Sequence, residues 1–194
     1  MLAEILEERK FGKKEVVRQE ARFRKVSRSF ENAQYTFEIW ARGGDYRDLH
    51  RHRQMTQERQ LFTIDWGYDL EKEVIKSEFV NEIKKAYKEI EKIFKKIAKF
   101  SPYIAQYVVP FGYLQHWYIR LTAREIYWMV ELRTGPQGRP HYREVCQQIA
   151  KEASDVTPAI FQGLMTDWND YSLARRESEK KIDKKLQSLE RKRK

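Results

Sequence analysis

Arginine and histidine side chains gather in one short stretch, Arg51-His52-Arg53, which could neutralise a phosphorylated ligand. The planar guanidinium group forms paired, charge-assisted hydrogen bonds to phosphate oxygens. The chain has only eight glycines and contains neither GxxxxGK[ST] nor GxGxxG, so a glycine-rich backbone loop is not available for this task. The sequence therefore predicts a site for an anionic, nucleotide-type molecule that is built from side chains.

A second group of arginines, which includes Arg124 and Arg133, follows an aromatic run. If residues 123–133 form a helix, Arg133 lies at the end of an apolar stripe on one helix face. The apolar residues of that stripe are Ile126, Met129 and Val130. A buried guanidinium group needs partners. A ligand could supply them, or a carboxylate could. The candidate carboxylates are Glu131, Glu38 and Asp65.

The sequence patterns around these residues predict a single-domain, helix-rich α+β fold with a small antiparallel sheet. Alternating and β-branched residues predict strands over residues 33–40 and 61–66. Asp45 is expected to cap a short helix that runs to Arg53. The apolar period of residues 79–97 predicts a long helix. Residues 108–119 fit either a strand or a buried helix.

Capping signals predict the remaining helices. Thr122 and Glu125 have the spacing of a capping box for a helix over residues 123–133, which should end at the Gly-Pro turn that follows. Pro140 and Pro158 suit the first turns of two more helices. Charged helices are expected over residues 1–28 and 166–194, on either side of a domain over residues 29–165.

The net charge of +10 comes from the two ends of the chain. Residues 1–28 carry nine basic and five acidic residues, residues 175–194 carry ten and four, and residues 29–174 are neutral overall. Solvated amphipathic helices are the preferred interpretation, and an RNA or membrane-surface contact is the alternative. No apolar stretch is long enough to span a bilayer, and the first residues do not read as a signal peptide. The lone Cys146 excludes an internal disulfide and has no partner at metal-ligand spacing. These features predict a cytoplasmic protein.

The sequence blocks, in their order, resemble the flavin-dependent thymidylate synthases. The central signature of that family is RHRxxSxNExSxRY, and residues 51–56 read RHRQMT. Residues 35–37, YTF, stand where the family has a strand reading FTF. Residues 105–110, AQYVVP, resemble AR-x-x-LP, and residues 122–133, TAREIYWMVELR, resemble N-x-R-S-L-x-N-F-L-x-L-R. The correspondence covers residues 26–150 and is closest to a subgroup in which two such domains are fused in tandem.

This resemblance implies a homotetramer whose active sites lie where subunits meet. It implies the conversion of dUMP to dTMP with FAD, NADPH and methylene-tetrahydrofolate. Arg51, His52 and Arg53 are expected to contact FAD and to position dUMP. Glu31 and Arg124 match flavin-side positions.

Arg133 matches the arginine that ionises the uracil ring. A guanidinium group beside N3 lowers the pKa of N3 because it favours the anion. A uridine nucleotide would then supply the partner that a buried Arg133 needs.

The chain departs from the family pattern at positions that hold the nucleotide. The signature's Glu, Ser and Arg are Arg59, Leu61 and Thr63, and the arginine of AR-x-x-LP is Gln106. Leucine and threonine cannot replace a hydroxyl and a guanidinium group. The first functional hypothesis is therefore an enzyme to which a partner domain or subunit supplies the missing groups.

Two alternatives remain. One is a flavin- or nucleotide-binding scaffold or regulator of the same fold that has lost dTMP synthesis. The other is an RNA-binding protein that uses its basic ends. Its possible stacking residues are Trp40, Trp66, Trp117 and Tyr118.

Overall fold

The computed structural model describes residues 26–169, 182, 184 and 185. The chain forms two compact units, one from residues 36–120 and one from residues 1–35 together with 121–194. They are named here the sheet unit and the helical unit. No helix among the described residues is both long and apolar enough to cross a membrane. The helix predicted over residues 1–28 lies almost wholly outside the described residues, and the domain boundaries at 29 and 165 stay a prediction.

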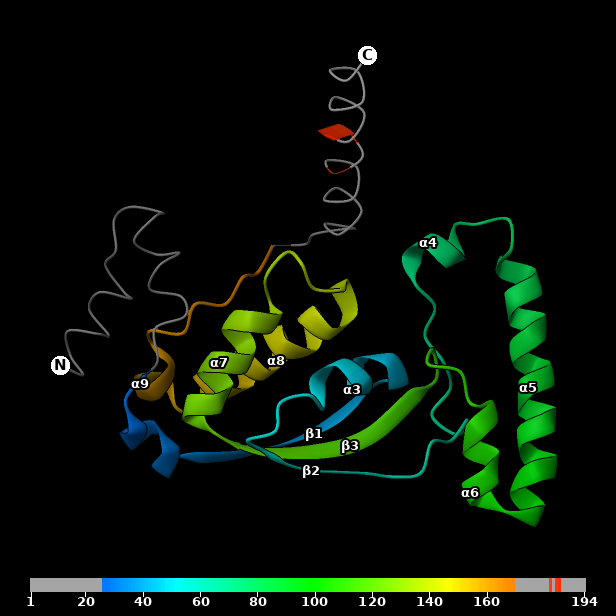
Figure 1. Cartoon of the computed structure of the whole chain (residues 1–194), viewed down its shortest axis with the longest axis horizontal. Helices are drawn as coiled ribbons and strands as arrows, with labels where there is room; N and C mark the ends of the chain where they lie inside the picture. Colours follow the sequence, from blue (N-terminus) through cyan, green and yellow to red (C-terminus); the bar gives the residue numbers. More distant parts are fainter. Residues whose placement is uncertain (1–25, 170–181, 183, 186–194) are drawn as a thin grey trace. The chain divides into compact units, whose positions relative to one another are not determined.

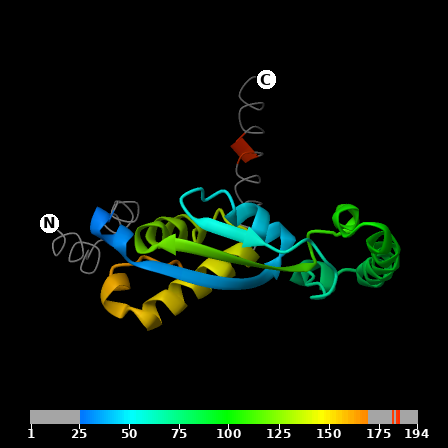
Figure 2. The same ribbon diagram turned by 90° about the horizontal axis from the view of Figure 1, so that it is seen from below.

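The sheet has three strands, β1 (Gln34–Arg42), β2 (Thr56–Arg59) and β3 (Leu114–Thr122), in the order β1-β3-β2 (Figures 1 and 2). β2 pairs with β3 in antiparallel register. β1 also runs antiparallel to β3, because the oxygen of Ala33 accepts from Ala123 and the amide of Gly43 donates to Tyr113. The predictions of a strand over residues 33–40 and of a helix-rich α+β fold with a small antiparallel sheet are confirmed.

The strand predicted over residues 61–66 is wrong. The strand in this region is β2, which ends at Arg59. The amide side chain of Gln115 takes the place of a neighbouring strand. Its Oε1 accepts from the Thr63 amide and its Nε2 donates to the Thr63 oxygen, each at a distance of 3.0 Å. An alternating sequence pattern cannot distinguish this arrangement from a strand. Gly67 then reverses the chain direction at a φ of 72°.

The helix α3 (Gly43–Leu49) lies against one face of the sheet (Figure 1). On β3, the alternating buried residues include Trp117 and Ile119, and the ring of Tyr46 from α3 meets Trp117 edge-on at 5.3 Å. Two details of the expected helix are wrong. Asp45 does not cap it, because the Asp45 carboxylate accepts from Arg42 Nε at 3.3 Å. The helix also ends before Arg51-His52-Arg53, which therefore follow it as a turn and loop.

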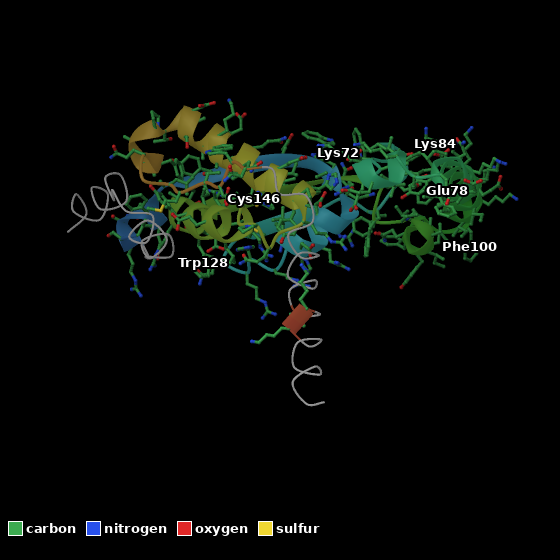
Figure 3. All side chains as sticks on the ribbon, turned by 90° about the horizontal axis from the view of Figure 1, so that it is seen from above. Lys72, Glu78, Lys84, Phe100, Trp128 and Cys146 are labelled. Carbon is green, nitrogen blue, oxygen red and sulfur yellow. The ribbon has the colours of Figure 1, made fainter. Side chains whose placement is uncertain are left out.

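The long predicted helix is confirmed as α5 (Val80–Phe100). The short helix α4 (Lys72–Ile75) precedes it, and α6 (Pro102–Ala105) and the 3-10 helix η2 (Gln106–Val108) fold back beside it. Figure 3 labels Lys72, Lys84 and Phe100 in this region. The buried Tyr113 hydroxyl donates to Glu91 of α5 at 3.3 Å. Burial, followed by the charge of Glu91, raises the pKa of Tyr113, so this hydroxyl stays a donor.

The helical unit contains the 3-10 helix η1 (Arg28–Asn32), α7 (Ala123–Arg133), α8 (Pro140–Val156) and α9 (Pro158–Phe161). The predicted capping box is confirmed, because the Thr122 hydroxyl accepts from the Glu125 amide at 3.3 Å. Such a cap stabilises a helix by about 1 kcal/mol. Pro140 and Pro158 occupy the first turns of α8 and α9, as predicted. The charged helix predicted from residue 166 falls mostly outside the described residues, and residues 166–169 are not helical.

A buried arginine, Arg143 of α8, holds the end of this unit together. Its side chain is 2% exposed. Its Nε donates to the Thr134 oxygen at 3.0 Å and its Nη2 to the Asn169 oxygen at 2.5 Å. A methyl group added to Gly138 would stand only 2.8 Å from the Arg143 stem. The neighbouring Cys146 (labelled in Figure 3) is also fully buried.

Candidate functional site

The Arg51-His52-Arg53 triplet follows directly from the end of α3. The His52 amide donates to the Leu49 oxygen at 3.1 Å, which ties the triplet to the helix. His52 is buried, whereas Arg51 and Arg53 are exposed. Among the described residues, neither Arg51 nor Arg53 forms an ion pair or a side-chain hydrogen bond. Cations after a helix C-terminus interact favourably with its free carbonyls, and these two also leave their donors open to an anion.

An aromatic cluster lies beside the triplet in the sheet unit. The ring of His50 stacks on Tyr46 with centroids 5.4 Å apart and planes 14° apart. Tyr46 meets Phe62 edge-on at 6.1 Å, and the guanidinium group of Arg59 lies over both rings. We call Tyr46, His50, Arg59 and Phe62 the α3–β2 cluster. Sequence reasoning treated Arg59 only as a lost glutamate, although its change of charge was a signal for a changed site.

Glu31 and Arg124, the two expected flavin-side residues, meet in the helical unit. Arg124 Nη1 donates to Glu31 Oε1 in an ion pair. Glu31 lies in η1 and Arg124 lies in the first turn of α7. Because η1 packs against α7, these two residues meet although they are distant in sequence. The pair is partly exposed, so its contribution to stability is about 0–1 kcal/mol. It presents both a donor and an acceptor at the surface.

Arg133 is the last residue of α7, and the stripe that it ends is buried as predicted. Arg133 itself is half-buried because the helix stops there, and its Cζ lies 5.7 Å from the centre of the Tyr142 ring. Among the described residues of the helical unit, the fully buried arginine is Arg143, which donates to backbone oxygens. Sequence reasoning missed Arg143, since nothing in its spacing separates it from the exposed Arg139.

The predicted site residues thus form two groups. Arg51, His52 and Arg53 belong to the sheet unit, and Glu31, Arg124 and Arg133 belong to the helical unit. The roles that the family resemblance implies for both groups, toward FAD and the uridine nucleotide, stay predictions.

The family resemblance is supported by a match of residues 3–159 to the family model described as "Thymidylate synthase complementing protein". The chain belongs to this flavin-dependent thymidylate synthase family. The resemblance expected from the RHR triplet and the downstream blocks is therefore confirmed.

Proteins similar to this chain include three described as UPF0159 proteins. One from Chlamydia muridarum is 35% identical over 161 residues, which make up 82% of this chain and 30% of that protein. Another from Chlamydia pneumoniae is 33% identical over 159 residues, 80% of this chain and 30% of that protein. A third, from Thermoplasma acidophilum, is 31% identical over 159 residues, 80% of this chain and 32% of that protein. The chain spans about a third of the length of these relatives.

The fold is also similar to that of a solved structure, a UMP/dUMP methylase PolB from Streptomyces cacaoi bound with 5-Br UMP. The TM-score is 0.59 at 17% sequence identity, and the match covers 70% of this chain and 74% of the other. At this identity the likeness establishes the fold. The predicted fold of the thymidylate synthase family is confirmed by this comparison.

Proposed function

We propose that this chain takes part in the methylation of a uridine nucleotide, dUMP to dTMP, with FAD as cofactor and methylene-tetrahydrofolate and NADPH as co-substrates. The observation that carries the proposal is the pair of exposed guanidinium groups at Arg51 and Arg53, which make no ion pair within the described part of the chain. Family membership and the UMP/dUMP methylase fold support the same reading.

The residues present fit a phosphorylated cofactor. Arg51 and Arg53 flank the buried His52, and the loop that carries them is held by a backbone hydrogen bond to α3. Two guanidinium groups on one loop suit the diphosphate of FAD. When bound, the flavin of FAD would supply hydride transfer. The Glu31–Arg124 pair offers polar contacts from the helical unit. In this proposal Arg133 favours the N3 anion of uracil and thereby activates the ring.

At several positions where the family pattern has a residue that holds the nucleotide, this chain has a different residue, such as Leu61 and Thr63. We propose that a second copy of the chain or a further domain supplies the nucleotide-holding groups, in an assembly whose sites lie at subunit interfaces. The oligomer expected from the family is a homotetramer.

A catalytically degenerate scaffold of the same fold is the second candidate, and one observation favours it. Thr63, which stands where the signature has an arginine, forms hydrogen bonds within the sheet unit. Its backbone pairs with Gln115 and its hydroxyl donates to Asp65. Such a residue serves the fold and leaves no charged group for a nucleotide.

The reaction test uses the purified chain with added FAD, methylene-tetrahydrofolate and NADPH. We expect oxidation of NADPH that depends on dUMP, with dTMP detected as the product. Flavin binding without dUMP-dependent turnover, in the chain alone and together with its natural partner, would support the scaffold instead. Absence of both flavin and uridine-nucleotide binding would contradict the proposal altogether. Salt-sensitive RNA binding that is lost on removal of residues 175–194 would favour the RNA-binding alternative, although Trp117 is buried and cannot serve as a stacking platform.

Replacing Arg133 with alanine is expected to weaken dUMP binding by about tenfold or more, the effect of losing one charged contact. The side chain is half-buried at the end of α7, so the fold should survive its removal. Calorimetric titration gives the affinity and circular dichroism the folded state. Arg139→Ala, at an exposed position beyond the following turn, is the control. If Arg133→Ala only unfolds the protein, Arg133 is a structural residue.

A further inference from the structure

Arg59 ends β2 and is held in place from several directions. It lies opposite Trp117 of β3, so its side chain stands on the same face of the sheet as Trp117. Its Cζ is 4.4 Å from the centre of the Phe62 ring and 5.8 Å from that of Tyr46. Its Nη1 donates to the Gln60 oxygen at 2.9 Å and to Gln106 Oε1 at 3.2 Å. The guanidinium group is therefore positioned before any ligand arrives.

One edge of this guanidinium group is open. Both hydrogen bonds use Nη1, which leaves Nε and Nη2 without an acceptor among the residues that the structure describes. No carboxylate of those residues pairs with Arg59, and the adjacent Glu58 points to the other sheet face because side chains alternate along a strand. The parallel N–H groups of Nε and Nη2 match two oxygens of a phosphate. Arg59 is thus an exposed, oriented cation that lacks an anion.

An unsatisfied acceptor lies on the same face of β2. Gln57 Nε2 donates to the His50 oxygen at 3.1 Å, which directs Oε1 away from that carbonyl. Gln57 Oε1 is buried and has no hydrogen-bond partner within the described chain. Two residues along a strand are about 7 Å apart. Because Gln57 Oε1 is buried, the group on this face that an incoming phosphate can reach is the open Nε and Nη2 edge of the exposed Arg59.

The positions of Arg59 and Gln106 relative to the family pattern explain why the cation stands here. The signature has a glutamate at position 59 and an arginine at position 106, whereas this chain has an arginine and a neutral amide. The two side chains touch in the structure. Compared with that pattern, the positive charge at this contact lies on β2 and the neutral amide on η2. Gln106 also binds the Phe62 amide at 2.9 Å, so it orients the new arginine and the ring beneath it.

We infer that Arg59 forms the phosphate subsite for a nucleoside monophosphate, with Gln106 as its positioning residue. This inference rests on the proposed function, because it assigns the phosphate of the same uridine nucleotide. It differs from the family pattern in the residue that carries the charge.

The test compares dUMP with deoxyuridine, which lacks the phosphate, by calorimetric titration of flavin-loaded protein. Arg59→Gln should weaken dUMP binding about 10- to 100-fold and change deoxyuridine binding less than about twofold. Arg59→Gln combined with Gln106→Arg should restore most of the dUMP affinity, because the charge returns to the other side of the contact. Equal losses for both ligands, or no loss, would overturn the inference.

Inorganic phosphate separates this inference from the proposed function. In a ¹H–¹⁵N spectrum of the wild-type protein, the Arg59 Nε signal should shift on addition of phosphate and should be insensitive to an equal concentration of chloride. A shift without any dUMP binding would leave the phosphate subsite standing and overturn the proposed reaction. Binding of dUMP with no phosphate-dependent shift would retain the reaction and overturn the role of Arg59.

Discussion

Replacing Arg51 with alanine is expected to remove bound flavin from the purified protein. Arg51 is exposed, follows the end of α3 and makes no ion pair or side-chain hydrogen bond within the described residues, so its loss should not disturb the fold. One charge-assisted contact to phosphate contributes about 1.5–3 kcal/mol, which corresponds to an affinity for FAD about 10- to 100-fold weaker. Visible absorbance of the purified protein and a fluorimetric FAD titration measure the effect.

Arg47→Ala is the matched control for this experiment. Arg47 is exposed like Arg51 but lies within α3, where its guanidinium group is over the Phe111 ring at 5.1 Å and pairs with Asp48 at 3.8 Å. Its removal should change FAD affinity less than about threefold. Unchanged flavin content in Arg51→Ala, or equal losses in the two variants, would count against a flavin site at the triplet.

The second large effect is expected from Arg143→Ala in the helical unit. This change leaves the oxygens of Thr134 and Asn169 without their donor and opens a cavity where the long side chain was packed. Loss of buried packing together with charged hydrogen bonds lowers the free energy of unfolding by about 3–5 kcal/mol. Urea denaturation followed by circular dichroism gives this value from the midpoint and slope.

Arg143→Met separates the two contributions, since it keeps most of the aliphatic volume and removes the donors. It should cost about 2 kcal/mol. Arg139→Ala serves as the control, because Arg139 is exposed and its side chain makes no capping hydrogen bond at the start of α8; its effect should stay within about 0.5 kcal/mol. A free energy of unfolding for Arg143→Ala within 1 kcal/mol of wild type would show that water replaces the guanidinium group.

Local signals in the sequence predicted those elements whose ends are determined by local chemistry. The Thr122 cap, Pro140 and Pro158 determine helix starts through hydrogen bonds or a fixed backbone angle within a few residues, and those starts are confirmed. The error at residues 61–66 has the opposite origin. The backbone there pairs with the Gln115 side chain, a partner more than fifty residues away that no local pattern reveals.

The start of α3 shows the same limit. Gly43 and Gly44 follow the end of β1 and begin the helix, and their amides donate to the oxygens of Tyr113 and Phe111. The helix is therefore shifted toward the N-terminus, and Arg51 lies beyond its end.

The sequence indicated which residues form the candidate site but only some of the contacts between them. Spacing identified the triplet and the apolar stripe that ends at Arg133, and the family resemblance paired Glu31 and Arg124 with the same cofactor side. The contact between Arg59 and Gln106 could not be predicted, since it depends on how β2 and η2 approach each other in three dimensions. For the same reason, the sequence does not reveal which arginine is buried.

The close approach of Gly138 to the Arg143 stem has a consequence for evolution. Any side chain at position 138 would collide with atoms that must stay where they are for Arg143 to reach its two backbone oxygens. The Tyr142 ring stands equally close, at 2.9 Å, so a bulkier residue at 138 is tolerable only where both the Arg143 stem and the Tyr142 ring make room. Among homologues that keep this turn, positions 138, 142 and 143 should therefore change together.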